Sequence, residues 1–352
     1  MRELADAAGI GFGSAVSFQL FQDYLWDGQQ KSISIFERDF NLAVVHNGLG
    51  WSGEPEFFAT ENKDAVWFVG KQIEALQSVG ISDIRGHCLV YPKYSPLWLQ
   101  DGVRKGEIGR DQLIELMEKS IVNRVGRWRG KITEWVVVNE PYRHWSEDND
   151  FLQTVIGDEY IEIAFQAARA ADPKATLIFN DTFNHAGSSG YNSIFNVSNT
   201  VNTEQTRRIV DRLQQRGLID GVGLQMHLDG AYPPDKNDVV KTMQSYGTPV
   251  YVTECDVDIR NVPGSQEERF ASQARIYADS LDACFQSGVC LSFSLWEFGD
   301  KYSWCEDPQY GGVSNADATP YDDDLEPKPA WYALWDVLNG HATAMNKPAA
   351  FQ

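Results

Sequence analysis

The sequence is short of positive charge. Its 352 residues include 30 lysines and arginines against 50 aspartates and glutamates, which gives a formal net charge of −20 at pH 7. Binding to nucleic acid or to an anionic membrane surface depends on clustered lysine and arginine. We therefore expect neither nucleic acid nor membrane as a partner.

Long apolar runs are also absent from the sequence. No stretch approaches the roughly 20 apolar residues that span a membrane, and residues 1–16 lack the pattern of a secretion signal. No internal repeat, low-complexity tract or proline-rich linker divides the chain. We expect a soluble protein with a single domain over residues 1–352.

The sequence lacks the usual motifs of metal, redox and acyl-transfer sites. None of its five cysteines forms a CxxC pair, its six histidines show no HExxH spacing, and no serine lies in a GxSxG context. The acidic run at residues 322–324 is interpreted as a solvated loop, with a weak calcium site as the alternative. We expect no metal and no cofactor.

Two of the cysteines lie close together in the sequence. Cys284 and Cys290 are expected at the end of a helix and at the start of the next strand, where a disulfide and two buried thiols are both compatible with the pattern. The sequence assigns no role to the other three, Cys88, Cys255 and Cys305. Together with the acidic composition and a glycosylation signal at Asn196, the pair favours an extracellular or periplasmic location.

Short apolar runs alternate with longer segments of helical spacing. The runs are typical of strands buried on both faces and lie at residues 11–16, 41–46, 83–90, 134–139, 176–181, 221–227, 249–256 and 291–298. Helical spacing occurs at residues 62–79, 111–129, 158–171, 204–216 and 266–285. Eight such units predict an α/β fold, a closed (β/α)8 TIM barrel, rather than an open sheet that would carry a GxGxxG turn.

Two of the predicted strands end in glutamate. Asn139 and Glu140 follow one apolar run, and Glu254 ends another, two residues before Asp256. Functional groups of such barrels lie where the strands end. Two carboxylates facing each other there support glycoside hydrolysis, in which one protonates the leaving oxygen and the other attacks the anomeric carbon, about 5 to 5.5 Å away in retaining enzymes. A pair of rim glutamates in salt bridges is the alternative.

Other residues near the strand ends could tune these carboxylates or hold a ligand. His227 ends its predicted strand and could hydrogen-bond Glu254 on one side and Asp256 on the other. The alternative is a histidine whose hydrogen bonds have only a structural role. Aromatic residues follow the third and eighth strands: Tyr91, Tyr94, Trp98, Tyr302, Trp304 and Tyr310. Neutral aromatic platforms beside carboxylates suit uncharged sugars.

These residues resemble glycoside hydrolase family 10, the (β/α)8 retaining endo-β-1,4-xylanases. The resemblance covers nearly the whole chain, and its most specific pieces are Arg85-Gly86-His87, Trp135 to Pro141, Thr253-Glu254 with Asp256, and Asp300 to Trp304. It implies a glycoside hydrolase that cleaves a β-1,4-linked plant polysaccharide, xylan by default. The implied mechanism is a double displacement by two glutamates.

The resemblance also implies a role for each matching residue. Glu140 corresponds to the acid/base, Glu254 to the nucleophile, and Asn139 to the amide that holds the 2-hydroxyl of the sugar at the cleavage point. His227 and Asp256 correspond to the pair that supports the nucleophile. Substrate-binding positions are implied for Asn47, Trp51, His87, Gln225, Trp296 and Trp304.

The resemblance bears on the cysteines and on partners as well. Cys284 and Cys290 fall where fungal-type members carry a disulfide, which favours the bridge over two thiols. We expect a secreted monomer whose partner is a polysaccharide or oligosaccharide.

The motifs that grip the glycone sugars depart from the family pattern. After the second strand the xylanases usually read Glu-Asn-x-x-Lys-Trp, and here His46 and Gly50 replace the glutamate and the lysine. After the third strand the usual Trp-His-x-Gln becomes Tyr91-Pro92-Lys93-Tyr94. One alternative is therefore the same chemistry on a decorated xylan, another β-glycan or a glycosylated small molecule. A non-catalytic carbohydrate-binding barrel is disfavoured, because the catalytic set is complete.

Overall fold

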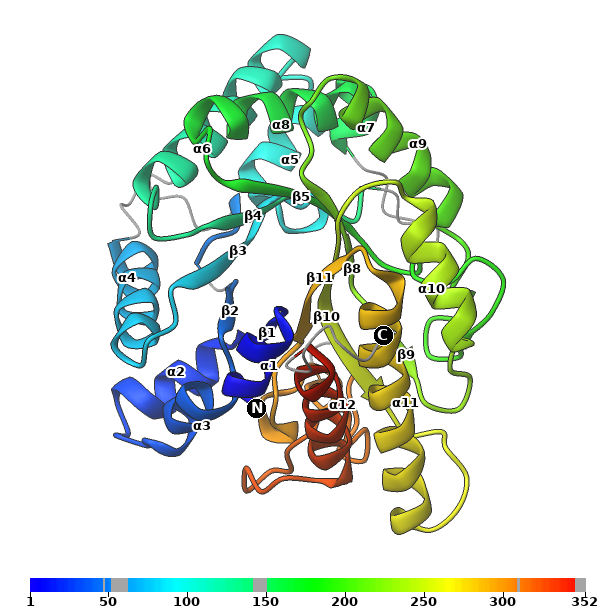
Figure 1. The fold of residues 1–352 in the computed structure, drawn as a ribbon. Helices are drawn as coiled ribbons and strands as arrows, with labels where there is room; N and C mark the ends of the chain where they lie inside the picture. Colours follow the sequence, from blue (N-terminus) through cyan, green and yellow to red (C-terminus); the bar gives the residue numbers. More distant parts are fainter. Residues whose placement is uncertain (47, 52–62, 142–150, 309–310, 346–352) are drawn as a thin grey trace.

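The computed structural model describes residues 1–46, 48–51, 63–141, 151–308 and 311–345. Eight parallel strands close into a barrel with helices around it (Figure 1). The strands are β1 (Gly11–Val16), β2 (Leu42–Val45), β3 (Asp83–Val90), β4 (Glu134–Asn139), β5 (Thr176–Asp181), β8 (Gly221–Leu224), β10 (Val250–Asp258) and β11 (Cys290–Leu295). They pair in chain order, and β10 and β11 pair with each other while β11 pairs with β1, so the barrel predicted from the sequence is confirmed.

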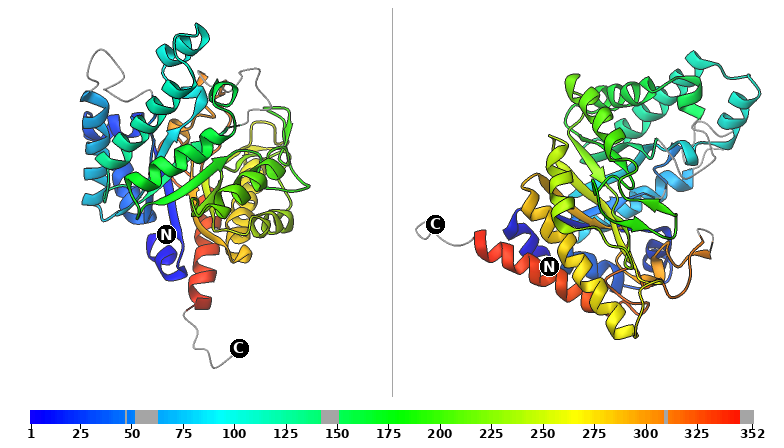
Figure 2. Two further views of the ribbon diagram at one scale, coloured as in Figure 1. Left: turned by 90° about the horizontal axis from the view of Figure 1, so that it is seen from above. Right: turned by 90° about the vertical axis from the view of Figure 1, so that its right-hand side faces the viewer.

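The five predicted helices are present, with ends within two residues of the prediction: α4 (Lys63–Ser78), α6 (Arg110–Arg127), α8 (Glu159–Ala171), α9 (Thr203–Gln215) and α11 (Gln266–Ser287). The sequence analysis did not place the others: α1 (Arg2–Ala8), α2 (Phe18–Leu25), α3 (Lys31–Asp39), α5 (Leu97–Arg104), α7 (Phe151–Val155), α10 (Lys236–Ser245) and α12 (Pro329–Met345). Helices α1 and α12 lie side by side (Figure 2). No helix in the described ranges has the length and apolar character of a membrane span.

The barrel interior is filled by side chains that cross from strand to strand. Arg85 on β3 is fully buried, and it donates to Glu134 on β4 and, at 2.8 Å, to the Ser292 hydroxyl on β11. A Cβ on the neighbouring Gly86 would lie 2.5 Å from the ring of Trp135, so only glycine fits there. These contacts explain why the Arg85-Gly86-His87 motif begins with a large cation and then a residue without a side chain.

The predicted strand at residues 221–227 is wrong in its second half. Strand β8 ends at Leu224, and His227 begins the separate short strand β9 (His227–Asp229), which pairs with the end of β10. Between them Met226 has a left-handed backbone with φ 59°. Strand β11 likewise ends three residues before the predicted end, because Glu297 also takes a left-handed conformation, with φ 67°. Hydrophobicity alone does not record such backbone turns.

The two cysteines that were expected to pair do so. Cys284 on α11 and Cys290 at the start of β11 form a disulfide with a Cα–Cα distance of 5.1 Å. In the chain-entropy account a bridge across so short a loop stabilises the fold by about 2 kcal/mol. The remaining cysteines, Cys88, Cys255 and Cys305, are buried thiols.

Candidate active site

The carboxyl ends of the strands place a set of polar and aromatic side chains around one mouth. Each comes from the last residues of a strand or from the residues directly after it. They are His46 after β2, His87 and Tyr91 from β3, Asn139 and Glu140 from β4, Asn180 and Asp181 from β5, Gln225 and His227 beside β8 and β9, Glu254 and Asp256 from β10, and Trp296 and Glu297 after β11.

Glu254 is held from three sides and is only 4 % exposed. The Asn180 amide donates to its Oε1 at 2.6 Å, His227 Nε2 lies 3.3 Å from its Oε2, and His87 Nδ1 lies 3.6 Å from Oε1. Burial alone would raise the pKa of this carboxyl, but the imidazoles and the Asn180 amide outweigh burial and lower it. Glu254 is therefore ionised at neutral pH.

The two histidines beside Glu254 differ in charge. Burial opposes a charge on His227, but the bond from its Nδ1 to Asp256, at 2.8 Å, and its bond to Glu254 raise its pKa to about 10. Burial lowers the pKa of His87 to about 4. At neutral pH the positive charge beside Glu254 is thus that of His227. The two hydrogen bonds predicted for His227 are present.

Glu140 is less buried than Glu254 and has a different set of neighbours. The Tyr91 hydroxyl donates to its Oε2 at 2.5 Å, and the Gln225 amide donates to its Oε1 at 2.9 Å. Its backbone is left-handed, with φ 46°. Both carboxylate oxygens of Glu140 therefore accept from neutral donors, whereas Glu254 faces a cation.

Asn139 and Asn180 connect the two carboxylates. Asn139 Oδ1 accepts from Asn180 at 2.7 Å and from Gln225 at 3.2 Å, so the amide orientation directs its Nδ2 away from both. Within the described ranges no group accepts from that Nδ2, which leaves it as a donor for a ligand hydroxyl. Asn180 Oδ1 in turn accepts from the Thr253 hydroxyl at 2.7 Å.

The sequence analysis missed several of these groups, Asn180 and the Tyr91 hydroxyl among them. Asn180 touches both Asn139 and Glu254, and Tyr91 was noted only as an aromatic residue. A usable signal exists for Asn180, because it and Asp181 end an apolar run in the same way as Asn139 and Glu140. No sequence pattern would have directed the Tyr91 hydroxyl to Glu140.

The structure places the residues that were predicted to bind sugar in different surroundings. Trp51 is 1 % exposed and packs in the hydrophobic core, so the structure does not place it on the mouth, and that prediction is wrong. Gln225 lies in the mouth, with its amide bonded to Glu140 and Asn139. His87 packs edge-on against Trp296, with ring centroids 5.1 Å apart. Asn47 lies outside the described residues.

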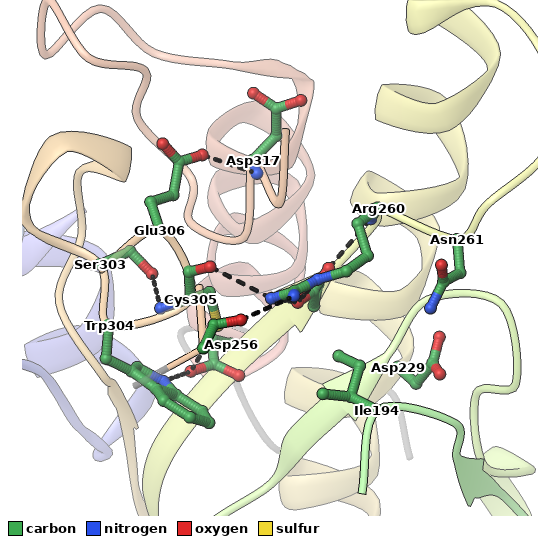
Figure 3. Close-up of polar contacts among 12 residues, drawn as sticks. Ile194, Asp229, Asp256, Arg260, Asn261, Ser303, Trp304, Cys305, Glu306 and Asp317 are labelled. Atoms are coloured by element: carbon green, nitrogen blue, oxygen red, sulfur yellow. Dashed lines mark hydrogen bonds and ion pairs between the residues drawn. The ribbon is translucent and has the colours of Figure 1, made fainter. Parts of the chain in front are cut away.

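Trp304 stands on the other side of the supporting carboxylate. Its indole N–H donates to Asp256 Oδ2 at 2.7 Å (Figure 3). Its ring stacks on Phe195. A cavity of about 350 Å³, including its open side, lies between these rings, His227 and the ion pair of Asp258 with Arg260. The mouth therefore continues past Asp256 into a half-open, aromatic-walled space.

This arrangement can carry out acid/base and nucleophilic chemistry at one carbon atom. A buried ionised carboxylate with a cationic neighbour suits attack, and a more exposed carboxyl with two neutral donors suits proton transfer. Within the described ranges no group of three or more histidine, cysteine or acidic side chains could hold a metal ion.

Comparison with known proteins agrees with this geometry. A model of glycosyl hydrolase family 10 matches residues 1–337. Endo-1,4-β-xylanase 1 of Humicola insolens is 31% identical over 348 residues, which is 96% of this chain and 74% of that protein. Endo-1,4-β-xylanase B of Thermotoga neapolitana is 28% identical over 96% of this chain and 91% of its own.

Solved structures give the same result. Xylanase 10B from Thermotoga petrophila RKU-1, crystallised with xylobiose, superposes with a TM-score of 0.82 at 26% identity, covering 97% of each chain. Native xylanase 10B from Thermotoga maritima also gives 0.82, at 27% identity over 97% of this chain and 99% of its own. The chain belongs to glycosyl hydrolase family 10 and is a glycoside hydrolase that retains the anomeric configuration.

Proposed function

We propose that the protein hydrolyses β-1,4-xylan, with Glu254 as nucleophile and Glu140 as acid/base. The observation that carries the proposal is the contrast between the two carboxylates: Glu254 is ionised beside the His227 cation, and Glu140 lies between the donors Tyr91 and Gln225. The relatives named above as xylanases, and the neighbour crystallised with xylobiose, support xylan as the substrate.

The proposed reaction has two steps. Glu254 attacks the anomeric carbon while Glu140 gives its proton to the leaving oxygen, so a covalent glycosyl ester forms and the glycosidic bond breaks. Glu140, now ionised, takes a proton from water, and the oxygen of that water displaces Glu254. Asn139 Nδ2 donates to the 2-hydroxyl of the sugar at the cleavage point, and Trp296 and Trp304 form walls of the sugar site. The His227 cation stabilises the Glu254 carboxylate when it is released.

The first test is the configuration of the product. We expect proton NMR of xylo-oligosaccharide hydrolysis to show the β-anomer first and the α-anomer only after mutarotation. We also expect a carboxyl separation of about 5 to 5.5 Å between Glu140 and Glu254 in a crystal structure. An α-product at early times, or a separation of about 8 Å or more, would end the nucleophile assignment.

A second candidate is a retuned substrate, and the residues of the glycone side favour it. The family's lysine and histidine are replaced by Gly50 and Pro92, which offer no side-chain donor. Pro92 is buried in a 3-10 turn (Pro92–Tyr94), and the Lys93 ammonium lies over the Tyr94 ring, 5.2 Å from its centroid. A decorated xylan or another β-glycoside could fill the space of the lost side chains.

We expect poor cleavage of an aryl β-xylobioside relative to xylan polymer. Charge-assisted hydrogen bonds to sugar hydroxyls contribute about 1.5 to 3 kcal/mol each, and two donors are lost. The double variant Gly50→Lys/Pro92→His should recover part of the difference in kcat/KM, limited by the turn that Pro92 fixes. Efficient cleavage of the xylobioside by the unmodified protein would remove the support for a retuned substrate.

We also propose that residues 1–352 act as a single catalytic domain, as a monomer, outside the cytoplasm. The Cys284–Cys290 disulfide supports the location, because such bonds persist in oxidising compartments.

A further inference from the structure

Two asparagines of the chain lie in the pattern, Asn-x-Ser/Thr, that accepts an N-linked glycan. The patterns are Asn180-Asp181-Thr182 and Asn196-Val197-Ser198. An N-linked glycan is bulky and hydrophilic, so an asparagine that carries one has to lie at the surface of the folded protein. The structure therefore decides which of the two asparagines can be modified.

Asn180 has no room for a glycan. Its side chain is fully buried, and its amide nitrogen donates to Glu254 at 2.6 Å and to Asn139 at 2.7 Å. Both protons of that nitrogen are therefore engaged within the mouth. A glycan on Asn180 would remove the donor to Glu254 and fill the mouth, so the folded protein leaves this asparagine unmodified.

Asn196 lies at the tip of a surface hairpin. Strands β6 (Tyr191–Asn192) and β7 (Val197–Ser198) pair antiparallel, and Asn196 is the last residue of the turn between them. It is exposed, and its φ of 54° is a left-handed conformation that asparagine tolerates better than most residues. Its Oδ1 accepts from the Tyr191 hydroxyl, and within the described ranges no group accepts from its Nδ2. The nitrogen that a glycan modifies is therefore available.

The hairpin directs the Asn196 amide away from the mouth. Directly paired residues of two antiparallel strands lie on the same face, and the pairs here are Asn192 with Val197 and Tyr191 with Ser198. The first pair is buried, and Asn192 lines the cavity described above, so this pair forms the inner face. Tyr191 lies on the outer face, and Asn196 is bonded to it. A glycan on Asn196 would extend from the outer face and leave the cavity open.

An aromatic surface lies beside Asn196 on this outer face. The Tyr191 ring packs edge-on against Tyr232, with ring centroids 5.6 Å apart, and Tyr232 is half exposed. The backbone N–H of Tyr191 also donates to the Tyr232 carbonyl at 3.2 Å, which fixes the two residues side by side. The C–H face of a sugar ring packs well on such aromatic surfaces.

We propose that Asn196 is a site of N-linked glycosylation and that the first N-acetylglucosamine packs on Tyr191. The inference rests on the proposed location outside the cytoplasm and not on the proposed substrate. In the transfer, Asn196 Nδ2 forms a bond to C1 of N-acetylglucosamine in a lipid-diphosphate-linked oligosaccharide. The bond from C1 to the diphosphate breaks, the lipid diphosphate leaves, and the amide nitrogen loses one proton to a base.

The test secretes the full chain from yeast behind a secretion signal and treats the protein with peptide N-glycosidase F. This enzyme converts a glycan-bearing asparagine to aspartate, which peptide mass spectrometry detects. We expect conversion at Asn196 and an unmodified Asn180. A folded, secreted protein with an unmodified Asn196 would overturn the proposal. If yeast does not secrete the chain, translation with endoplasmic-reticulum microsomes decides, through a glycan-dependent shift on a gel.

Asn196→Asp is the matched control for the site. It removes the acceptor nitrogen and keeps an oxygen that accepts from Tyr191, so the protein should fold and carry no glycan. Because the glycan leaves the cavity open, kcat/KM on xylan should be the same for this variant and for the glycosylated protein. Ser198→Thr preserves the pattern and should keep the glycan, whereas Ser198→Ala should lose it.

Thermal unfolding tests the packing on Tyr191. The glycosylated protein should melt about 2 °C above Asn196→Asp, because the sugar covers an aromatic ring. In proteins that also carry Tyr191→Ser this difference should vanish. A glycan that is present and gives the same difference with and without the Tyr191 ring would contradict the packing.

The outcomes separate this inference from the proposed function. A secreted protein that hydrolyses xylan and carries no glycan at Asn196 contradicts only the inference. A protein that is glycosylated at Asn196 and does not hydrolyse xylan supports the inference and contradicts the proposed function.

Discussion

Glu254→Gln is expected to abolish turnover, with kcat on xylan falling by about 10⁴-fold or more. An amide does not form the glycosyl ester of the first step. The exchange keeps the size of the side chain, and its carbonyl oxygen can still accept from Asn180. The loss should therefore reflect chemistry and not unfolding. Initial rates on xylan, together with the melting temperature, measure it.

The control for this variant is a glutamate remote from the mouth. Glu267 is exposed in the first turn of α11, and Glu267→Gln should leave the rate unchanged. A Glu254→Gln protein that folds normally and keeps more than a few per cent of its activity would remove Glu254 from the nucleophile role. Asp256, bonded to both His227 and Trp304, would then be the next carboxylate to examine.

The same variant reports on the charge of His227. Both Glu254 and Asp256 raise the pKa of His227 to about 10, so replacing Glu254 by a neutral amide should lower it. Asp256, the larger of the two influences, remains, and the imidazole should stay protonated at neutral pH. An NMR titration of the variant measures this shift.

The barrel can be predicted from the sequence because its strands are short runs made mainly of apolar residues. Strands β4 and β5 begin and end at the predicted residues, since each is an apolar run with polar residues at its ends. Strand β3 also has the predicted ends, although Arg85 and His87 interrupt its apolar residues. The prediction fails at two backbone turns, at Met226 and at Glu297, because apolar residues continue on both sides of each turn. Both residues have positive φ, which depends on tertiary contacts around the mouth and not on local composition.

The active-site carboxylates could be predicted, but most of what surrounds them could not. Glu140 and Glu254 are prominent because each follows a run of mainly apolar residues, where a charge needs a reason, although β10 continues past Glu254 to Asp258. The hydroxyl of Tyr91 reaches Glu140 from another strand, and the carboxylate of Glu297 reaches His46 from the far end of the chain. Such pairings depend on the barrel closing, which a single sequence does not record. The prediction that Trp51 binds sugar is wrong for a different reason. The motif gives the position of Trp51 in the sequence, but it does not reveal that the side chain is buried.

Left-handed backbone recurs at the mouth and connects these observations. Glu140, Met226 and Glu297 all have positive φ, and each lies within two residues of the end of a strand. A non-glycine residue in this conformation costs about 1 kcal/mol or more. The cost is offset by the contacts that each turn creates, since the turns at Glu140 and Glu297 direct carboxylates to Tyr91 and to His46.

Glu140→Ala is expected to slow xylan hydrolysis by about 10²- to 10⁴-fold and to affect aryl glycosides with good leaving groups far less in the first step. A natural leaving sugar needs a proton as its bond to the anomeric carbon breaks, whereas an activated phenolate leaves without one. The second step still needs a base to activate water. The glycosyl ester on Glu254 should therefore accumulate, and KM for the aryl substrate should fall.

The kinetic signature of this variant distinguishes the acid/base from a residue that only holds the site together. Stopped-flow measurement should show a burst of phenolate equal to the enzyme concentration, followed by slow turnover. Tyr91→Phe is the matched comparison, because it removes the donor to Glu140 Oε2 and leaves the carboxyl in place. It should lower the rate on both substrate types by a smaller and similar factor and give no burst. If Glu140→Ala instead loses the same factor on xylan and on an activated aryl glycoside, proton donation to the leaving group is not its role.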